Sequence, residues 1–231
     1  MALLEPARGF RAALADTSKG VAVVSEVKRR SPSKGDLFAD LDPAALARTY
    51  EGGGASCLSV LTDEDWFGGS VADLRAARDA TSLPIIRKDF TVDARDVVDA
   101  RIMGADCVLL IAAALDDAEL RDFHALAAEI GLDALIEIHD EAELERALAV
   151  DGNLIGVNQR DLVTFQVDQE RAVRMAPQIP AGVVRVAESG VRDRADAAVL
   201  ADAGYHALLV GETLVKSGDP GLEIRRLRGL A

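Results

Sequence analysis

Stretches rich in Val, Ile and Leu recur along this chain, and amphipathic stretches separate them. Each apolar run is nearly continuous rather than alternating, which is typical of strands that are covered on both faces. Consecutive runs start 21 to 36 residues apart, so one helix and two short loops fit between neighbours. The pattern predicts parallel strands at residues 21–27, 57–62, 84–90, 107–113, 133–138, 154–160, 183–189 and 207–212.

The stretches between these runs carry the signals of helices. The first begins with Asp42, a favourable N-cap residue, followed by Pro43 at the first helical position. Others show apolar residues at three- and four-residue steps, and Ser70 can cap one of them. Glycines that would end helices before the next strand stand at Gly104, Gly131 and Gly204. We therefore predict helices over residues 42–54, 70–80, 116–131, 140–150 and 192–204.

Eight such strand–helix units, with no linker or change of composition, predict an α/β protein with a single (β/α)8 TIM barrel. An open doubly wound sheet is the alternative, and the regularity of the eight units favours the barrel. We expect the barrel to span residues 21–231. A short N-terminal helical segment, residues 1–20, precedes it, and we expect a helix over 10–14 to close the bottom of the barrel.

Composition and charge narrow the function. The 231 residues carry a formal net charge of −13, which argues against nucleic acid and against an anionic membrane surface. No apolar run approaches the ~18 residues that a membrane span needs, and no signal peptide is recognisable. Cys57 and Cys107 each lie among apolar residues, so we expect reduced core thiols and a cytoplasmic protein. An anionic ligand would need a locally positive site.

Polar residues interrupt the apolar runs where the predicted strands end. In a TIM barrel, the ends of the strands and the loops after them carry the chemistry. Burying isolated charges is costly, so a group of them at one end of a barrel indicates a functional site. The group comprises Glu26, Lys28, Lys88, Glu137, Asn158, Arg160, Glu188 and Ser189. Three cations against Glu26 and Glu137 would make this end of the barrel locally positive.

A phosphate site is the second signal. Glycines follow the last two strands, at Gly190 and Gly211, and allow backbone N–H groups to approach a phosphate. Ser31, Ser33 and Lys34 lie in the loop after the first strand, where they can reach the same phosphate or form a lid. We therefore expect a small, anionic, phosphorylated substrate.

These residues lie in stretches that closely resemble the indole-3-glycerol phosphate synthase family. The matching stretches run in order along nearly the whole chain from residue 20, and the combination of RKDF, IGVN-x-RDL and AESG is highly specific. They include EVKRRSPSKG (26–35), SVLTDEDWFGGS (59–70), IIRKDF (85–90), LIEIHDEAELERAL (135–148), IGVNQRDLVTFQVD (155–168) and VAESG (186–190).

The resemblance implies a reaction and roles for individual residues. 1-(o-Carboxyphenylamino)-1-deoxyribulose 5-phosphate would cyclise and lose CO₂ and water, without cofactor or metal. Lys88 would be the general acid of ring closure, Glu137 a general base or charge stabiliser, and Lys28 a substrate ligand and proton donor. Orienting roles would fall to Glu26, Asn158, Ser189 and Arg160. The aromatic ring would meet Phe67, Phe90 and Leu110, and the phosphate Ser31, Gly190, Gly211 and Thr213.

Chemistry supports these roles independently. Attack of a weakly nucleophilic ring carbon on a ketone needs a positioned proton donor, and a buried Lys88 beside another cation would have a lowered pKa. His139 lies near the site, where we expect a hydrogen bond within its loop. Gln159 replaces a smaller residue usual in the family; strand parity directs it outward, which predicts a minor effect. The family usually has a longer N-terminal extension that helps to cover the substrate, whereas about 20 residues precede the first predicted strand here, so we expect altered lid closure and affinity.

Two other functions remain open at this point. A sugar-phosphate isomerase would keep the barrel and the phosphate site, but such enzymes typically use a Cys/Asp pair, and neither cysteine lies at the end of a strand. A non-catalytic phosphometabolite-binding protein would not need Lys28, Lys88 and Glu137 together. We expect a monomer or a weak homodimer.

Overall fold

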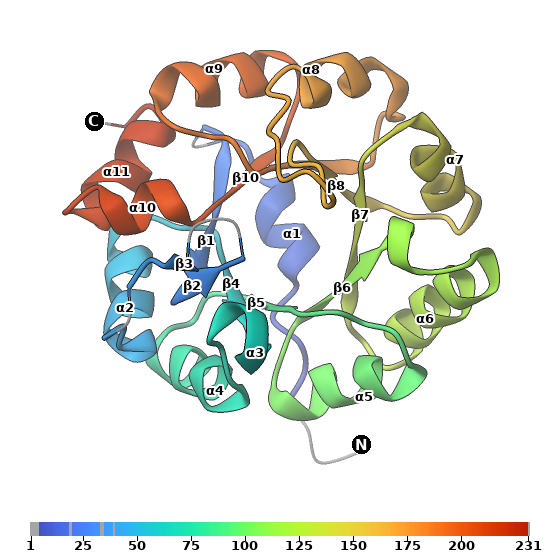
Figure 1. Cartoon of the computed structure of the whole chain (residues 1–231), viewed down its shortest axis with the longest axis horizontal. Coiled ribbons are helices and arrows are strands. Elements are labelled where there is room, and N and C mark those ends of the chain that lie inside the picture. Colours follow the sequence, from blue (N-terminus) through green and yellow to red (C-terminus); the bar gives the residue numbers. More distant parts are fainter. Residues whose placement is uncertain (1–4, 19, 33–34, 39, 231) are drawn as a thin grey trace.

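The computed structural model describes residues 5–18, 20–32, 35–38 and 40–230. Among these, eight parallel strands close into one barrel, and helices surround it as a ring (Figure 1). The strands are β1 (Ala22–Val27), β4 (Cys57–Leu61), β5 (Ile85–Lys88), β6 (Cys107–Ile111), β7 (Asp133–Ile138), β8 (Leu154–Asn158), β9 (Val184–Glu188) and β10 (Ala207–Val210). Pairing of β1 with both β4 and β10 closes the barrel, which confirms the TIM barrel and excludes the open sheet.

Helices follow each strand and pack outside the sheet (Figure 1). They are α2 (Pro43–Gly53), α4 (Val71–Ala80), α5 (Ala94–Met103), α6 (Asp117–Glu129), α7 (Glu141–Ala149), α8 (Arg171–Met175), α9 (Arg194–Asp202), α10 (Glu212–Lys216) and α11 (Pro220–Leu227). Smaller elements complete the loops: α3 (Glu64–Phe67), the hairpin β2 (Arg30–Ser31) and β3 (Gly35–Asp36), and 3₁₀ turns at Ala112–Ala114 and Ala176–Gln178.

The predicted caps have the expected geometry. The Asp42 carboxylate accepts hydrogen bonds from the backbone N–H groups of Ala44 and Ala45, and the Ser70 hydroxyl accepts one from Asp73 N at 3.2 Å. Gly104, Gly131 and Gly204 all have positive φ at the ends of helices. Local sequence thus fixes where these helices begin and end.

The core has two layers. The larger lies between the sheet and the helices and includes Leu58, Leu110 and Tyr50. The smaller lies inside the barrel, where Phe10 and Leu14 of α1 (Phe10–Ala15) pack against the first residues of several strands. α1 crosses the centre of the ring in Figure 1 and closes one end of the barrel, as predicted. The other end is therefore open to a ligand.

Candidate active site

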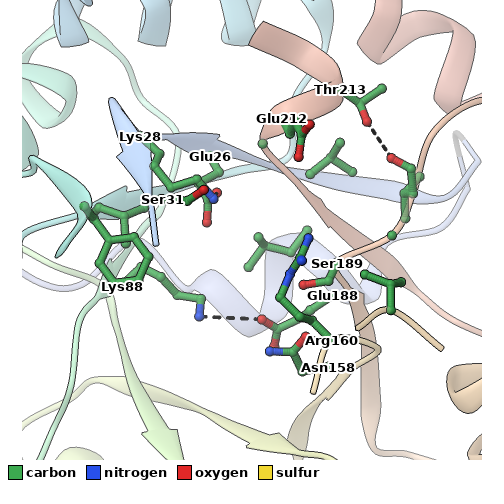
Figure 2. Close-up of a pocket in the computed structure, with 18 of the residues that line it drawn as sticks. Glu26, Lys28, Ser31, Lys88, Asn158, Arg160, Glu188, Ser189, Glu212 and Thr213 are labelled. Carbon is green, nitrogen blue, oxygen red and sulfur yellow. Dashed lines mark hydrogen bonds and ion pairs between the residues drawn. The ribbon is translucent and has the colours of Figure 1, made fainter. Parts of the chain in front are cut away.

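A cavity of about 960 Å³ lies at the carboxyl ends of the barrel strands. Residues from all eight predicted strand ends and the loops after them line it, and Figure 2 shows several of their side chains around one space. All but one of the predicted site residues contribute to its lining: Glu26, Lys28, Ser31, Phe67, Lys88, Phe90, Glu137, Asn158, Arg160, Ser189, Gly190, Gly211 and Thr213. Ser33 and Lys34 lie outside the described residues.

Leu110 is the exception, and its prediction as part of the apolar wall was wrong. It is fully buried in the layer between the sheet and the helices. Successive side chains of a strand point to opposite faces, so its neighbours Leu109 and Ile111 face the cavity instead. Ile111 pairs directly with Glu137 in the ladder between β6 and β7.

Lys88 lies at the centre of the charged part of the cavity. Its Nζ is 3.0 Å from Glu137 Oε2 and 3.7 Å from Glu188 Oε2. Burial alone would lower the pKa of Lys88, but the charges of Glu137, Glu188 and Glu26 outweigh it and raise the pKa above its ordinary value. The expected lowered pKa was therefore wrong, because the groups nearest to this ammonium are carboxylates and not a second cation.

Glu137 is held as an anion. Asn158 Nδ2 donates a hydrogen bond to its Oε1 at 3.1 Å, while Lys88 bonds the other oxygen. Burial opposes ionisation, yet the Lys88 charge and the hydrogen bond from Asn158 lower the pKa of Glu137. Asn158 is itself fixed, because its Oδ1 accepts a hydrogen bond from Arg160 N at 3.0 Å.

Glu188 behaves in the opposite way. It is buried, and its Oε1 has no hydrogen-bond partner among the described residues. Burial, together with the charge of Glu137, raises the pKa of Glu188 well above its ordinary value. The pKa values of the two carboxyl groups are therefore shifted in opposite directions, and Glu137 is the more acidic of the pair.

A second ion pair joins Lys28 to Glu26 beside the first. Both groups are largely buried, and the main chain of Gly211 approaches Glu26 so closely that a side chain at this position would collide with the carboxylate. The absence of a Cβ at Gly211 thus allows the strand end of β10 to pack against this ion pair.

The loops after β9 and β10 form the predicted phosphate end of the cavity. Ser189 and Gly190 both have left-handed backbone conformations, with φ of 65° and 78°. Thr213 Oγ1 donates a hydrogen bond to Val191 O at 2.6 Å, which ties the two loops together. Ser31 lines the same cavity from the hairpin after β1.

Apolar side chains line the remaining side. The rings of Phe67 and Phe90 lie 6.5 Å apart, inclined at 46°, and Leu109 and Ile111 lie on the strand surface below. Phe90 is 47% exposed at the rim. An aromatic ligand can therefore be enclosed next to the charged pairs.

Comparison with known proteins identifies the family. The family model for indole-3-glycerol phosphate synthase matches residues 1–227. An indole-3-glycerol phosphate synthase from Nocardioides sp. is 53% identical over 226 residues, which cover 98% of this chain and 85% of that protein. The chain belongs to the indole-3-glycerol phosphate synthase family. The resemblance carried by the sequence motifs is confirmed.

Solved structures of other barrel proteins are similar in fold alone. Thiamine phosphate pyrophosphorylase from Pyrococcus furiosus shares 15% identity at a TM-score of 0.68, covering 92% of this chain and 95% of its own. A 3-hexulose-6-phosphate synthase shares 14% identity at a TM-score of 0.69, and the match covers 91% of this chain and 99% of that protein. These identities are too low to add functional detail to the family assignment.

Several residues differ from expectation or were missed. Gln159 does not line the cavity, as strand parity predicts, but it is only 2% exposed, and its Nε2 donates to Ser189 O at 2.7 Å. His139 Nδ1 lies 3.1 Å from Glu143 Oε2, the expected loop contact, while its Nε2 is 3.7 Å from Glu137 Oε1. Glu188 was placed in the polar group at the strand ends but was given no role of its own. The available signal was a charged residue at the end of an apolar strand, and the structure aligns it with Asn158 on the neighbouring strand.

The two cysteines lie away from the cavity. Cys57 and Cys107 are the first residues of β4 and β6, buried and without a disulfide at the closed end of the barrel.

In the described part of the chain, no cluster of His, Cys, Asp and Glu is suited to hold a metal ion. Nor does any described helix have the length and apolar character to cross a membrane.

Proposed function

We propose that this chain catalyses the reaction of its family on 1-(o-carboxyphenylamino)-1-deoxyribulose 5-phosphate. Ring closure, decarboxylation and dehydration would give indole-3-glycerol phosphate. The observation that carries the proposal is the ion pair between Lys88 and Glu137, 3.0 Å apart inside a cavity that offers both an apolar wall and a phosphate-binding end.

Lys88 is the proton donor of ring closure in this scheme. A carbon–carbon bond forms between the ring carbon that bears the carboxylate and the ketone carbon, and negative charge develops on the ketone oxygen. The raised pKa keeps Lys88 protonated throughout the working range of pH. An alkoxide is more basic than an amine, so the proton still moves to oxygen as the bond forms.

Decarboxylation then needs no external electron sink. Ring closure leaves a cationic iminium in the new ring, and the electron pair of the breaking C–CO₂ bond flows into it. Glu137, ionised beside this cation, stabilises the positive charge until CO₂ leaves and the benzene ring is restored, a step that releases no proton. In the later dehydration, Glu137 accepts the proton that the carbon next to the departing hydroxyl loses as the indole ring forms. Lys28 binds the substrate carboxylate and gives a proton to the departing hydroxyl in the dehydration step. We therefore expect neither a metal nor an organic cofactor.

Cationic side chains in the cavity can bind a substrate with two anionic groups. The chain has a net charge of −13, but the cavity brings together the cations Lys28, Lys88, Arg160, Arg192 and Lys216, among the carboxyl groups of Glu26, Asp89, Glu137, Glu188, Glu212 and Glu223. The phosphate would lie against Ser31, Gly190, Gly211 and Thr213, and the aromatic ring against Phe67, Phe90 and Leu109, while Glu26, Asn158 and Ser189 orient substrate hydroxyls.

We further propose that the protein acts in the cytoplasm as a monomer or weak homodimer. Two buried, unpaired cysteines suit a reducing compartment. Sedimentation analysis across a range of concentrations tests the oligomeric state.

The decisive experiment incubates the purified chain with the carboxyphenylamino substrate and follows indole fluorescence together with released CO₂. We expect both signals to rise in equal amounts, and Lys88→Met to abolish them. Formation of an isomeric sugar phosphate without CO₂ would indicate an isomerase. Substrate binding without turnover would indicate a phosphometabolite-binding protein.

A further inference from the structure

Two glutamines hold the turn that follows β9. Gln159 Nε2 donates to Ser189 O at 2.7 Å, and Gln169 Nε2 donates to Gly190 O at 2.8 Å. Both glutamines come from the loop between β8 and α8, whose ends are joined by the hydrogen bond from Asp168 N to Gln159 O at 2.8 Å. Two consecutive carbonyl groups are therefore bound by one neighbouring loop.

The conformation of this turn requires support. Ser189 is one of few described non-glycine residues with positive φ, a conformation that costs about 1 kcal/mol or more. Gly190 is also left-handed, and a Cβ there would lie 2.7 Å from Val167 Cγ1 of the β8–α8 loop. The turn is thus pressed against the same loop that supplies the two amides.

Binding of the carbonyls also sets the direction of the N–H groups. In a trans peptide the N–H of the next residue points opposite to the carbonyl. The N–H groups of Gly190 and Val191 therefore point away from the two glutamines. Among the described residues, no hydrogen bond engages either N–H group. Consecutive free N–H groups in left-handed backbone form a concave site for anionic oxygens.

We infer that Gln159 and Gln169 are positioning residues for the phosphate of the substrate. They act through the backbone: their amides fix the Ser189 and Gly190 carbonyls, and this orients the Gly190 and Val191 N–H groups toward the phosphate oxygens. The inference rests on the proposed function for the identity of the phosphate-bearing ligand. It assigns a role to Gln159, which the sequence pattern had directed away from the site.

Burial supports this role for Gln159. A buried amide is costly unless it is hydrogen-bonded, and its Oε1 has no partner among the described residues. The carbonyl of Ser189 can only accept a hydrogen bond, so it binds the nitrogen of the amide. Gln159 leaves its Oε1 without a partner among the described residues, and this cost is consistent with a requirement for the hydrogen bond that its Nε2 donates to Ser189 O.

The test compares Gln159→Met and Gln169→Met with the unchanged protein. Methionine has a similar volume but cannot donate, and Gln169 is only half-buried, so its variant should fold normally. Gln178→Met is the matched control, because Gln178 is exposed and its amide bonds Glu141 outside the cavity. Steady-state kinetics and calorimetric titration with inorganic phosphate are measured for each protein.

We expect KM and the Kd for inorganic phosphate to rise about threefold to tenfold in each test variant, the range for one net hydrogen bond. The value of kcat should stay within about twofold, because the phosphate is remote from the reacting atoms. The Gln178→Met protein should be unchanged. A lowered Tm alone, with KM and phosphate affinity both unchanged, would show that the glutamines only stabilise the fold and would overturn the inference.

Phosphate binding also separates this inference from the proposed function. If the unchanged protein has no synthase activity but binds phosphate, and both variants weaken that binding, the positioning role stands and the proposed reaction fails. If the enzyme is active and the variants bind phosphate normally, the positioning role fails alone.

Discussion

Glu137 and Glu188 approach the same ammonium group, with carboxylate oxygens 3.0 and 3.7 Å from Lys88 Nζ, yet their pKa values shift in opposite directions. Glu137 gains a hydrogen bond from Asn158, whereas Oε1 of Glu188 has no partner in the described part of the chain. A single cation in a buried site stabilises one anion better than two. The two carboxyl groups around the proton donor therefore differ in acidity, with Glu137 the stronger acid and Glu188 the weaker.

Replacement of Lys88 tests the proton donor directly. Lys88→Met should lower kcat by at least about 10³-fold, near the upper range for general acid catalysis. The fold should persist, because methionine fills a similar volume and Glu137 can take up a proton once its partner is gone. Circular dichroism and steady-state kinetics check both statements. A loss of less than tenfold would make Lys28 the better candidate for the acid.

Replacement of Glu137 separates chemistry from binding. Glu137→Gln keeps size and some hydrogen bonding but removes charge and basicity, so we expect kcat to fall by about 10²- to 10⁴-fold. The KM should stay level or decrease, because one repulsion toward an anionic substrate is lost. Steady-state kinetics provide both values. Nearly normal kcat with a sharply raised KM would limit Glu137 to substrate binding.

Replacement of Glu188 should alter the dependence of stability on pH. The folded protein holds the Glu188 proton above the ordinary pKa of 4.5, while the unfolded chain releases it. The native state then binds more protons, so this residue contributes stability that decreases as pH rises from about 4.5 toward the raised pKa. A glutamine does not titrate, so Glu188→Gln should not lose stability in this way as pH rises.

The measurement is Tm across this pH window. At the high-pH end of the window, the Tm of Glu188→Gln should exceed that of the unchanged protein by about 2–4 °C, the effect of ~1 kcal/mol in a domain of this size. The two Tm curves should converge as pH approaches 4.5. Parallel curves over the whole window would mean that Glu188 is ionised in the folded protein.

Two adjacent leucines, both buried, should differ in their effect on substrate binding. Leu109 faces the cavity and Leu110 the helices. Leu109→Ala should raise KM about fivefold to thirtyfold through lost contact with the aromatic ring. Leu110→Ala should leave KM unchanged but lower the free energy of unfolding by about 2–5 kcal/mol. Urea unfolding and kinetics on both variants decide this, and a raised KM for Leu110→Ala would contradict the assigned faces.

The sequence predicted the inward face correctly wherever a polar residue marked it. Glu26, Lys88, Glu137 and Asn158 interrupt apolar strands and all line the cavity. The strand Cys107–Ile111 is apolar throughout, so nothing in it distinguishes the face of Leu110 from that of Leu109. Only the pairing of Ile111 with Glu137 reveals the inward face, and strand register is a tertiary property.

Electrostatics and loop contacts were harder to predict for a related reason. The pKa of Lys88 is raised first by Glu137 and then by Glu188, which come from strands about 50 and 100 residues later in the chain. The environment of Gln159 depends on Ser189, which follows the strand of Glu188. Strand parity correctly places Gln159 off the cavity, between Asn158 and Arg160, but it cannot predict the contact with the turn after β9.

Because α1 fills one end of the barrel, the contacts that stabilise that end are separate from the residues that line the cavity at the other end. Asp106, fully buried at the closed end, accepts hydrogen bonds from Arg8 N and Ile85 N and forms an ion pair with Arg78. None of these residues lines the cavity. Evolution can therefore adjust heat tolerance at the end that α1 fills while the catalytic end stays under separate selection, so that variants adapted to different temperatures can share one unaltered reaction chemistry.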